Sequence, residues 1–275
     1  MAHSTLTPHS AALDWQRVAA ALAGEPMDYQ LMYLPVTGST NDVARSLAAA
    51  GAPQGVVVFA DAQTAGRGRP GKSPWLTLPN LSIAVSVVLR PSLDPAALPQ
   101  VTMAAGVATV TAIRETTGVP AGLKWPNDVM VGTRKLGGIL AESILGAKAI
   151  AYVVLGIGLN CNFPVQALGP LPDAAVPPTS LQEDCGAPIS REALLIALLR
   201  RFGQVYGRLE AGEGDTVWQS YRAALGIVGR AVRIQTNTAP VDGTVEDVAA
   251  DGALVLRLPS GERRTFTFGE VSLRF

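Results

Sequence analysis

The chain is poor in the residue types that usually carry nucleophilic, redox or metal chemistry. Its 275 residues include two histidines, His3 and His9, and two cysteines, Cys161 and Cys185. Both histidines lie within ten residues of the amino terminus, where fraying is common. These counts argue against a catalytic histidine, a histidine-based triad and a histidine-rich metal site. The cysteines form no C-x-x-C pair, so the sequence predicts neither a zinc site nor a disulfide framework.

The chain also lacks an excess of charge and a long apolar run. Lys+Arg and Asp+Glu both number 22, giving a formal net charge of +0, which argues against a polybasic nucleic-acid binder. No stretch of about 18 apolar residues predicts a membrane span. The first ten residues lack the charged and apolar segments of a secretory signal. Since 48% of the residues are hydrophobic, a sizeable core can form, and we expect a soluble, cytoplasmic protein.

The hydrophobic pattern predicts an α+β protein whose character changes near Ile227. We expect a tail and helix over 1–28, a main domain over 29–226 and a small β-barrel over 227–275. The predicted helices cover residues 11–23, 39–49, 98–116, 191–209 and 216–225. The predicted strands of the main domain cover residues 29–36, 55–60, 81–90, 122–125, 128–131, 135–145 and 149–159. Those of the last part cover residues 231–236, 244–250, 253–258, 264–268 and 271–275. Residues 163–189 hold six prolines and predict a long surface loop.

The first candidate for chemistry is a stretch in which glycines alternate with cations. It reads QTAGRGRPGKSPW over 63–75. Glycine lets the backbone approach a ligand closely, and arginine offers a planar fork for phosphate or carboxylate. A solvated loop or an RNA-binding patch would have the same letters. Residues 66–73 also match the letters of a P-loop, but Pro74 follows where the helix of a P-loop must begin. A P-loop phosphotransferase therefore remains an alternative.

Two further motifs combine unusual residues with strand patterns. The chain has four lysines against 18 arginines, and one of them begins the motif KWPND at 124–128. Because Pro126 restricts the residue before it, the direction of the neighbouring Lys124 would be fixed. An exposed lysine at a β-bulge fits these five residues equally well. The motifs KLGGILAE at 135–142 and GIGLNCN at 156–162 place glycine inside strands, for tight packing or for close approach of a ligand.

In this order the motifs resemble the biotin protein ligase family. The resemblance rests on Ser39-Thr40-Asn41 and the four motifs above, and it covers residues 29–275. It implies a mixed-sheet catalytic domain of the class II synthetase type, flanked by helices, with an SH3-like carboxy-terminal domain. It also implies two reactions. Biotin and MgATP give biotinyl-5′-adenylate and pyrophosphate, and the biotinyl group then passes to a lysine of a biotin carboxyl carrier protein domain. Since the attacking carboxylate is already ionised, this chemistry needs no histidine base.

The resemblance assigns roles by motif position. Lys124 and Arg69 would be catalytic. Biotin would contact Ser39, Thr40, Asn41, Gln63, Gly66, Arg67, Gly68, Arg69, Lys124 and Gly138. ATP would contact Arg69, Lys72, Trp75, Asn127, Lys135 and Asn160. The chain departs from the family pattern at Lys72, where arginine is usual, and in the spacing that follows it.

The resemblance also bears on partners. Only 28 residues precede the first predicted strand, too few for a helical DNA-binding module, so we expect a ligase that binds no DNA operator and no membrane. Magnesium would arrive with ATP, and no metal site of the protein itself is predicted. An exposed edge strand would permit a homodimer. A lipoate ligase is the nearest alternative enzyme.

Overall fold

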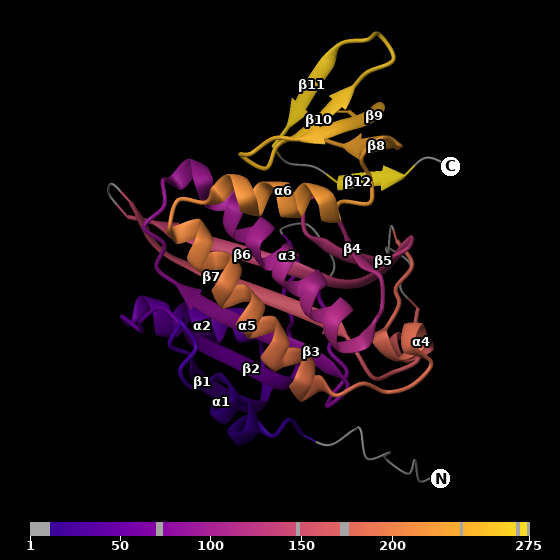
Figure 1. Cartoon of the computed structure of the whole chain (residues 1–275). Coiled ribbons are helices and arrows are strands. Elements are labelled where there is room, and N and C mark those ends of the chain that lie inside the picture. The colour runs from indigo at the N-terminus through magenta and orange to yellow at the C-terminus, as the bar shows by residue number, and fades with distance from the viewer. Residues whose placement is uncertain are drawn as a thin grey trace.

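A seven-stranded sheet forms the centre of the main domain. The computed structural model describes residues 12–69, 74–146, 149–170, 176–236, 239–267 and 270–273. The strand order is β1-β2-β3-β7-β6-β5-β4 (Figure 1). The first pair is parallel and all others are antiparallel. The strands are β1 (Gln30–Thr37), β2 (Val56–Gln63), β3 (Ser82–Leu89), β4 (Ala121–Lys124), β5 (Asp128–Val131), β6 (Arg134–Leu145) and β7 (Ile150–Asn160).

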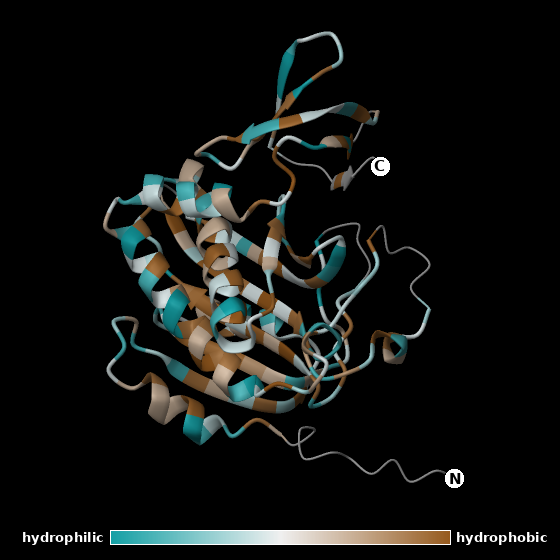
Figure 2. Ribbon diagram, turned by 45° about the vertical axis from the view of Figure 1, so that its right-hand side comes forward, coloured by the Kyte–Doolittle hydropathy of each residue, from teal (hydrophilic) through white to brown (hydrophobic). Residues whose placement is uncertain are grey.

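Helices cover both faces of this sheet, which explains why its middle strands are mostly apolar and buried along nearly their whole length. Every residue of β3 is buried, and so are the first seven of β2. The short α2 packs on one face against β2, β3 and β7, whereas α3 and α5 lie on the other face. Figure 2 shows apolar residues concentrated in the sheet and on the helix sides that face it. The helices are α1 (Trp15–Leu22), α2 (Thr40–Ala49), α3 (Leu98–Thr117), α4 (Leu181–Cys185), α5 (Arg191–Glu210) and α6 (Gly214–Ala224), with short 3-10 turns at Pro95–Ala97 and Val165–Leu168.

Helix α3 is the core helix of the main domain. The segment Pro95–Thr117 is long and apolar enough to cross a membrane by length and composition alone, and 56% of its most apolar 18-residue stretch is buried. It packs between the sheet and helices α5 and α6. Its apolar character is therefore that of a helix covered on several sides.

The last part of the chain forms a second, five-stranded antiparallel sheet. Its order is β11-β10-β9-β8-β12. The strands are β8 (Ala231–Gln235), β9 (Val241–Val248), β10 (Leu254–Arg257), β11 (Arg263–Phe266) and β12 (Glu270–Leu273). The sheet is tied to the main domain by two indole groups. Trp125 Nε1 donates to the Gly252 carbonyl and Trp218 Nε1 to the Val248 carbonyl, both at 2.8 Å. The predicted α+β class is confirmed.

The structure corrects the expectation of a long surface loop over 163–189. Residues 179–181 are fully buried, and α4 follows, capped by the Ser180 hydroxyl, which accepts from Glu183 N. The backbone of Thr179 pairs with Lys135 beside β6. The prolines interrupt the apolar periodicity from which a helix is predicted, but the stretch between two of them is long enough for this short capped helix. The first helix begins at Trp15 rather than residue 11, because Asp14 caps it. His3 and His9 lie outside the described residues.

Candidate active site

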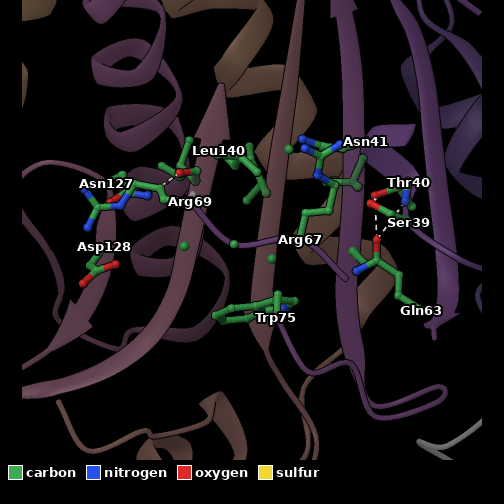
Figure 3. Close-up of a pocket in the computed structure, with 18 of the residues that line it drawn as sticks. Ser39, Thr40, Asn41, Gln63, Arg67, Arg69, Trp75, Asn127, Asp128 and Leu140 are labelled. Atoms are coloured by element: carbon green, nitrogen blue, oxygen red, sulfur yellow. Dashed lines mark hydrogen bonds between the residues drawn. The ribbon is translucent and has the colours of Figure 1, made fainter. Parts of the chain in front are cut away.

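A pocket opens on the sheet face that carries α2. Strands β3, β6 and β7, the start of α2 and the loop after β2 contribute its walls (Figure 3). The predicted site residues that line it are Ser39, Thr40, Asn41, Gln63, Arg67, Gly68, Arg69, Trp75, Asn127, Lys135 and Gly138. Residues from four separate motifs therefore meet in one place.

A chain of polar contacts closes one end of the pocket. The backbone N–H and the hydroxyl of Thr40 donate to Gln63 Oε1 at 2.8 and 3.0 Å, and Gln63 Nε2 donates to Thr77 Oγ1 at 3.1 Å. Ser86 Oγ lies 2.8 Å from Thr40 Oγ1 and 2.6 Å from Asn41 Oδ1. This buried hydroxyl of β3 was not among the predicted residues, because a single serine in an apolar strand carries no signal of its own.

The glycine- and arginine-rich loop is fastened at both ends by backbone hydrogen bonds. Ala65 N donates to the Gly38 carbonyl at 2.8 Å, and Trp75 N donates to the Gly66 carbonyl at 3.1 Å. A Cβ at Gly66 would lie 2.2 Å from the Trp75 carbonyl oxygen. Gly66 therefore shapes the base of the loop and does not itself line the pocket.

The glycines of β6 and β7 make the pocket floor. Gly138 and Gly158 are cross-strand partners. A Cβ at Gly158 would lie 2.5 Å from Trp75 Nε1, and one at Gly156 would lie 2.1 Å from Asn41 Oδ1. The space that glycine leaves is thus occupied by two side chains of the site. The Trp75 indole N–H is buried, and no acceptor for it exists among the described residues.

The two arginines of the loop point to different ends of the pocket (Figure 3). Arg67 Nη1 donates to Asp42 Oδ1 at 2.6 Å, and its Nη2 lies 2.9 Å from Glu142 Oε1. The hydrogen bond that Arg67 donates to Asp42 is the main cause that raises the pKa of Arg67 above its ordinary value. Arg69 extends instead toward the end where Asn127 and Asp128 lie.

Two lysines flank one carboxylate at that end. Lys135 Nζ lies 2.6 Å from Asp128 Oδ1, and Lys124 Nζ lies 4.0 Å from Asp128 Oδ2. Lys124 is only 4% exposed, so the alternative of an exposed lysine at a bulge is wrong. Lys124 does not itself line the pocket, but it stands directly behind Asp128, which does. Asn127 Nδ2 donates to the Ile139 carbonyl, while Asn127 Oδ1 is buried with no donor to it in the described part of the chain.

The other predicted site residues lie apart from the pocket or outside the described residues. Asn160 Nδ2 donates to the Thr179 carbonyl at 2.9 Å and so holds the segment before α4. Lys72 lies outside the described residues. No site role was predicted for Ser86, Asp128, Glu142, Gly156 or Gly158. Asp128 and Glu142 end two of the quoted motifs. Glu142 could have been placed by alternation, because residues 138, 140 and 142 of one strand share a face.

The remaining alternatives for this region find little support. No helix follows the glycine-rich loop in residues 74–81, and β3 begins at Ser82, so the helix that a P-loop requires is missing from that described segment. Burial raises the pKa of the Cys161 thiol to about 12, so this cysteine stays a neutral, packed side chain. No group of three or more His, Cys, Asp or Glu side chains that could hold a metal occurs within the described ranges.

Comparisons with known proteins point to the same family as the order of the motifs. The sequence model of the Biotin/lipoate A/B protein ligase family matches residues 33–160, and that of the Biotin protein ligase C terminal domain matches residues 227–274. The chain is 33% identical over 229 residues to a biotin–[acetyl-CoA-carboxylase] ligase of Paracoccus denitrificans, covering 82% of this chain and 94% of the relative. It is 36% identical over 239 residues to the same ligase of Mycobacterium tuberculosis, covering 82% and 83%. A biotin protein ligase from Aquifex aeolicus, solved in complex with biotin and ATP, superposes with a TM-score of 0.74 at 26% identity, covering 89% of this chain and 98% of that one.

Proposed function

Since this chain belongs to the biotin protein ligase family, we propose that it performs both reactions of a biotin–[acetyl-CoA-carboxylase] ligase. It activates biotin with ATP to biotinyl-5′-adenylate, releases pyrophosphate, and transfers the biotinyl group to a lysine of a carrier protein. The observation that carries this proposal is the shared pocket. Its polar end, glycine floor and cationic end come from five motifs separated in sequence.

We assign the polar end of the pocket to the bicyclic ring of biotin. Thr40, Gln63 and Ser86 hold one another's side chains in fixed rotamers, so hydrogen-bonding groups are oriented before a ligand arrives. The ring of biotin carries N–H donors and a carbonyl acceptor, which such hydroxyl and amide groups can pair. Ser39, at the N-cap of α2, adds a further hydroxyl at this end.

We assign the cationic end to the carboxylate of biotin and the phosphates of ATP. Arg69, Lys135 and Lys124 bring positive charge to this end. The biotin carboxylate is ionised at neutral pH and attacks without a base. What the step requires is alignment of two anions and stabilisation of the charge that builds on the α-phosphate. The buried, unpaired Trp75 N–H and Asn127 Oδ1 are groups that a bound nucleotide would satisfy.

We assign magnesium to the same cationic end of the pocket, where it would bind together with ATP. Among the described residues that line the pocket, Asp128 is the one carboxylate. Mg²⁺ is usually held by one or two carboxylates together with substrate phosphates and water. Asp128, which Lys135 and Lys124 flank, is therefore the carboxylate that the described pocket lining would offer to the ion, and the ion would neutralise phosphate charge.

The carrier and the compartment complete the proposal. The acceptor is a lysine side chain, whose amine displaces AMP from the mixed anhydride. We place the enzyme in the cytoplasm, where a reducing environment suits the free thiols of Cys161 and Cys185.

The test is biotin-dependent exchange between ATP and pyrophosphate with magnesium, run beside lipoate and a control without acid. Exchange with biotin alone is the expected result. Exchange with lipoate instead would contradict the choice of substrate while keeping the activation chemistry. Nucleotide hydrolysis without any acid, and no exchange, would contradict the proposed reaction. Incorporation of labelled biotin into an added carrier domain then tests the second step.

A further inference from the structure

A group of charged side chains lies beside the pocket, where α2 begins. Glu142 extends from β6 on the same face as the pocket residue Leu140, because alternate residues of a strand share a face. Its carboxylate accepts from Asn41 Nδ2 at 2.9 Å and from Arg45 Nη2 at 2.9 and 3.0 Å. Arg67 Nη2 lies 2.9 Å from the same carboxylate. One side chain thus joins three segments that are distant in sequence.

The position of Arg67 in this group determines what its charge can do. Its two terminal nitrogens are paired with two different carboxylates, those of Asp42 and Glu142. Asp42, Glu142 and Arg67 are all partly exposed, with Glu142 the most buried of the three at 26%. A guanidinium that already pairs with two carboxylates is poorly placed to bind phosphate. The two arginines of the loop therefore have different tasks, since Arg69 extends to the opposite end of the pocket.

Building on the proposed function, we infer that Glu142 is a positioning residue for biotin binding. Through Arg67 it holds residues 66–69 of the loop against the pocket, and through Asn41 it fixes the first turn of α2. A loop containing Gly66 and Gly68 loses much conformational freedom when it is ordered. Contacts that order the loop before the ligand arrives reduce the loss of conformational entropy that the free energy of binding must offset.

Glutamine at this position would keep the size of the side chain but not its role. Three different donors converge on the two carboxylate oxygens of Glu142. Glutamine offers one oxygen and turns an NH₂ group toward the same donors. Glu142→Gln should therefore weaken one of the two ion pairs of Arg67, leaving the pair with Asp42, while the strand and its backbone pairing stay intact.

The rate of cleavage by trypsin after Arg67 measures this change in the absence of any ligand. The protease must insert an arginine side chain into its acidic S1 pocket, so cleavage after Arg67 requires that its ion pairs open. We expect Glu142→Gln to raise the rate of cleavage between Arg67 and Gly68 on the order of tenfold, because about one charge-assisted hydrogen bond is lost. The matched control is Glu246→Gln, because Glu246 also bridges two arginines, Arg257 and Arg263, in the second sheet. Its rate should equal that of the wild type.

Kinetics separate positioning from a general effect on folding. In the exchange assay, Glu142→Gln should raise KM for biotin on the order of tenfold and change kcat and KM for ATP much less. Arg67→Gln removes the same contact from the loop side, and combining both changes should raise KM little beyond the larger single effect. Glu142→Asp, which keeps the carboxylate, should recover part of the affinity.

The outcomes are distinct. Faster cleavage together with a selective rise in KM for biotin supports the positioning role. An unchanged cleavage rate, an unchanged KM for biotin, or independent effects in the double variant would each overturn it. If wild-type protein shows no biotin-dependent exchange, the proposed function fails and the positioning role for biotin falls with it, whatever trypsin reports. Should Glu142→Gln not fold by circular dichroism, Arg67→Gln decides by the same KM measurement.

Discussion

Arg191 Nη1 lies 3.0 Å from Asp61 Oδ1, and the two side chains are only 3% and 4% exposed. The same guanidinium nitrogen donates to the Ser82 carbonyl at 3.0 Å, and Tyr33 donates its hydroxyl hydrogen to Asp61 Oδ2 at 2.6 Å. This ion pair links the first residue of α5 to β2, two residues before Gln63. A buried charge pair therefore fixes the start of α5 to the strand that ends at the pocket residue Gln63.

Replacing Arg191 by methionine should strongly destabilise the fold. Removing one partner of a buried pair leaves the other charged and unpaired, at a cost of about 3–5 kcal/mol. Urea titration at neutral pH measures the change in the free energy of unfolding. The matched control is Arg201→Met in the same helix, whose pair with Glu115 is exposed and should contribute about 0–1 kcal/mol. Equal effects of the two substitutions would contradict the importance given to burial.

Gly158→Ala should dislodge Trp75 from the pocket floor. The new Cβ would lie 2.5 Å from Trp75 Nε1, so the indole and the loop end that carries it must move. We expect KM for ATP to rise on the order of tenfold or more, because the indole belongs to the end assigned to the nucleotide. Gly207→Ala is the control, since a Cβ there meets nothing within 4 Å. An unchanged KM for ATP in Gly158→Ala would contradict the placement of Trp75.

The motifs named more of the residues that line the pocket than of the side chains that hold those residues in place. The motifs named Gln63 and Arg67, which line the pocket, and Lys124, whose Nζ lies 4.0 Å from the pocket residue Asp128. The partners Ser86 and Glu142 were missed, since their roles arise from the register of distant strands. For example, Ser86 meets Thr40 and Asn41 only because β3 pairs with β2 and α2 packs across both.

The fold shows the same division between local and distant causes. Strands with continuous apolar runs and helices with clear caps were predicted within a few residues. The segment before α4 was not, because its order comes from backbone pairing of Thr179 with Lys135, which no local pattern reveals. Likewise, Asp128 meets Lys135 only because of the register of β5 on β6, which shifts between Val129 and Met130.

The free energy of unfolding should fall as the pH rises above about 9. Burial raises the pKa of the Cys161 thiol to about 12, and burial likewise raises the pKa of the buried Tyr221 hydroxyl. In the unfolded chain these groups ionise near their ordinary values, about 8.5 and 10, whereas the folded protein keeps their protons. The unfolded state thus binds fewer protons, and stability decreases with pH at up to about 1.4 kcal/mol per pH unit for each group.

Urea titrations at pH 8, 9, 10 and 11 measure this slope. Cys161→Ala should lower stability at pH 8 by creating a small cavity. Its decline between pH 9 and 10 should be shallower than that of the wild type, so the difference in stability between the two proteins should change steadily as the pH rises. A wild-type stability that stays level from pH 8 to 11 would contradict the burial-driven shifts.

Lys124→Met should abolish most of the adenylation rate while leaving the fold intact. Methionine keeps the apolar stem of the buried lysine and removes its charge, and Asp128 keeps its 2.6 Å partner Lys135. We expect biotinyl-adenylate formation in single turnover to slow by on the order of 10²–10³, as for loss of one preorganised charge at a reacting centre. Lys124→Arg serves as the control for charge alone. Because arginine places its charge on a larger planar fork, it should recover only part of the rate. A Lys124→Met rate within about threefold of the wild type, which is under 1 kcal/mol of barrier, would show that the positive charge behind Asp128 takes no part in activating biotin.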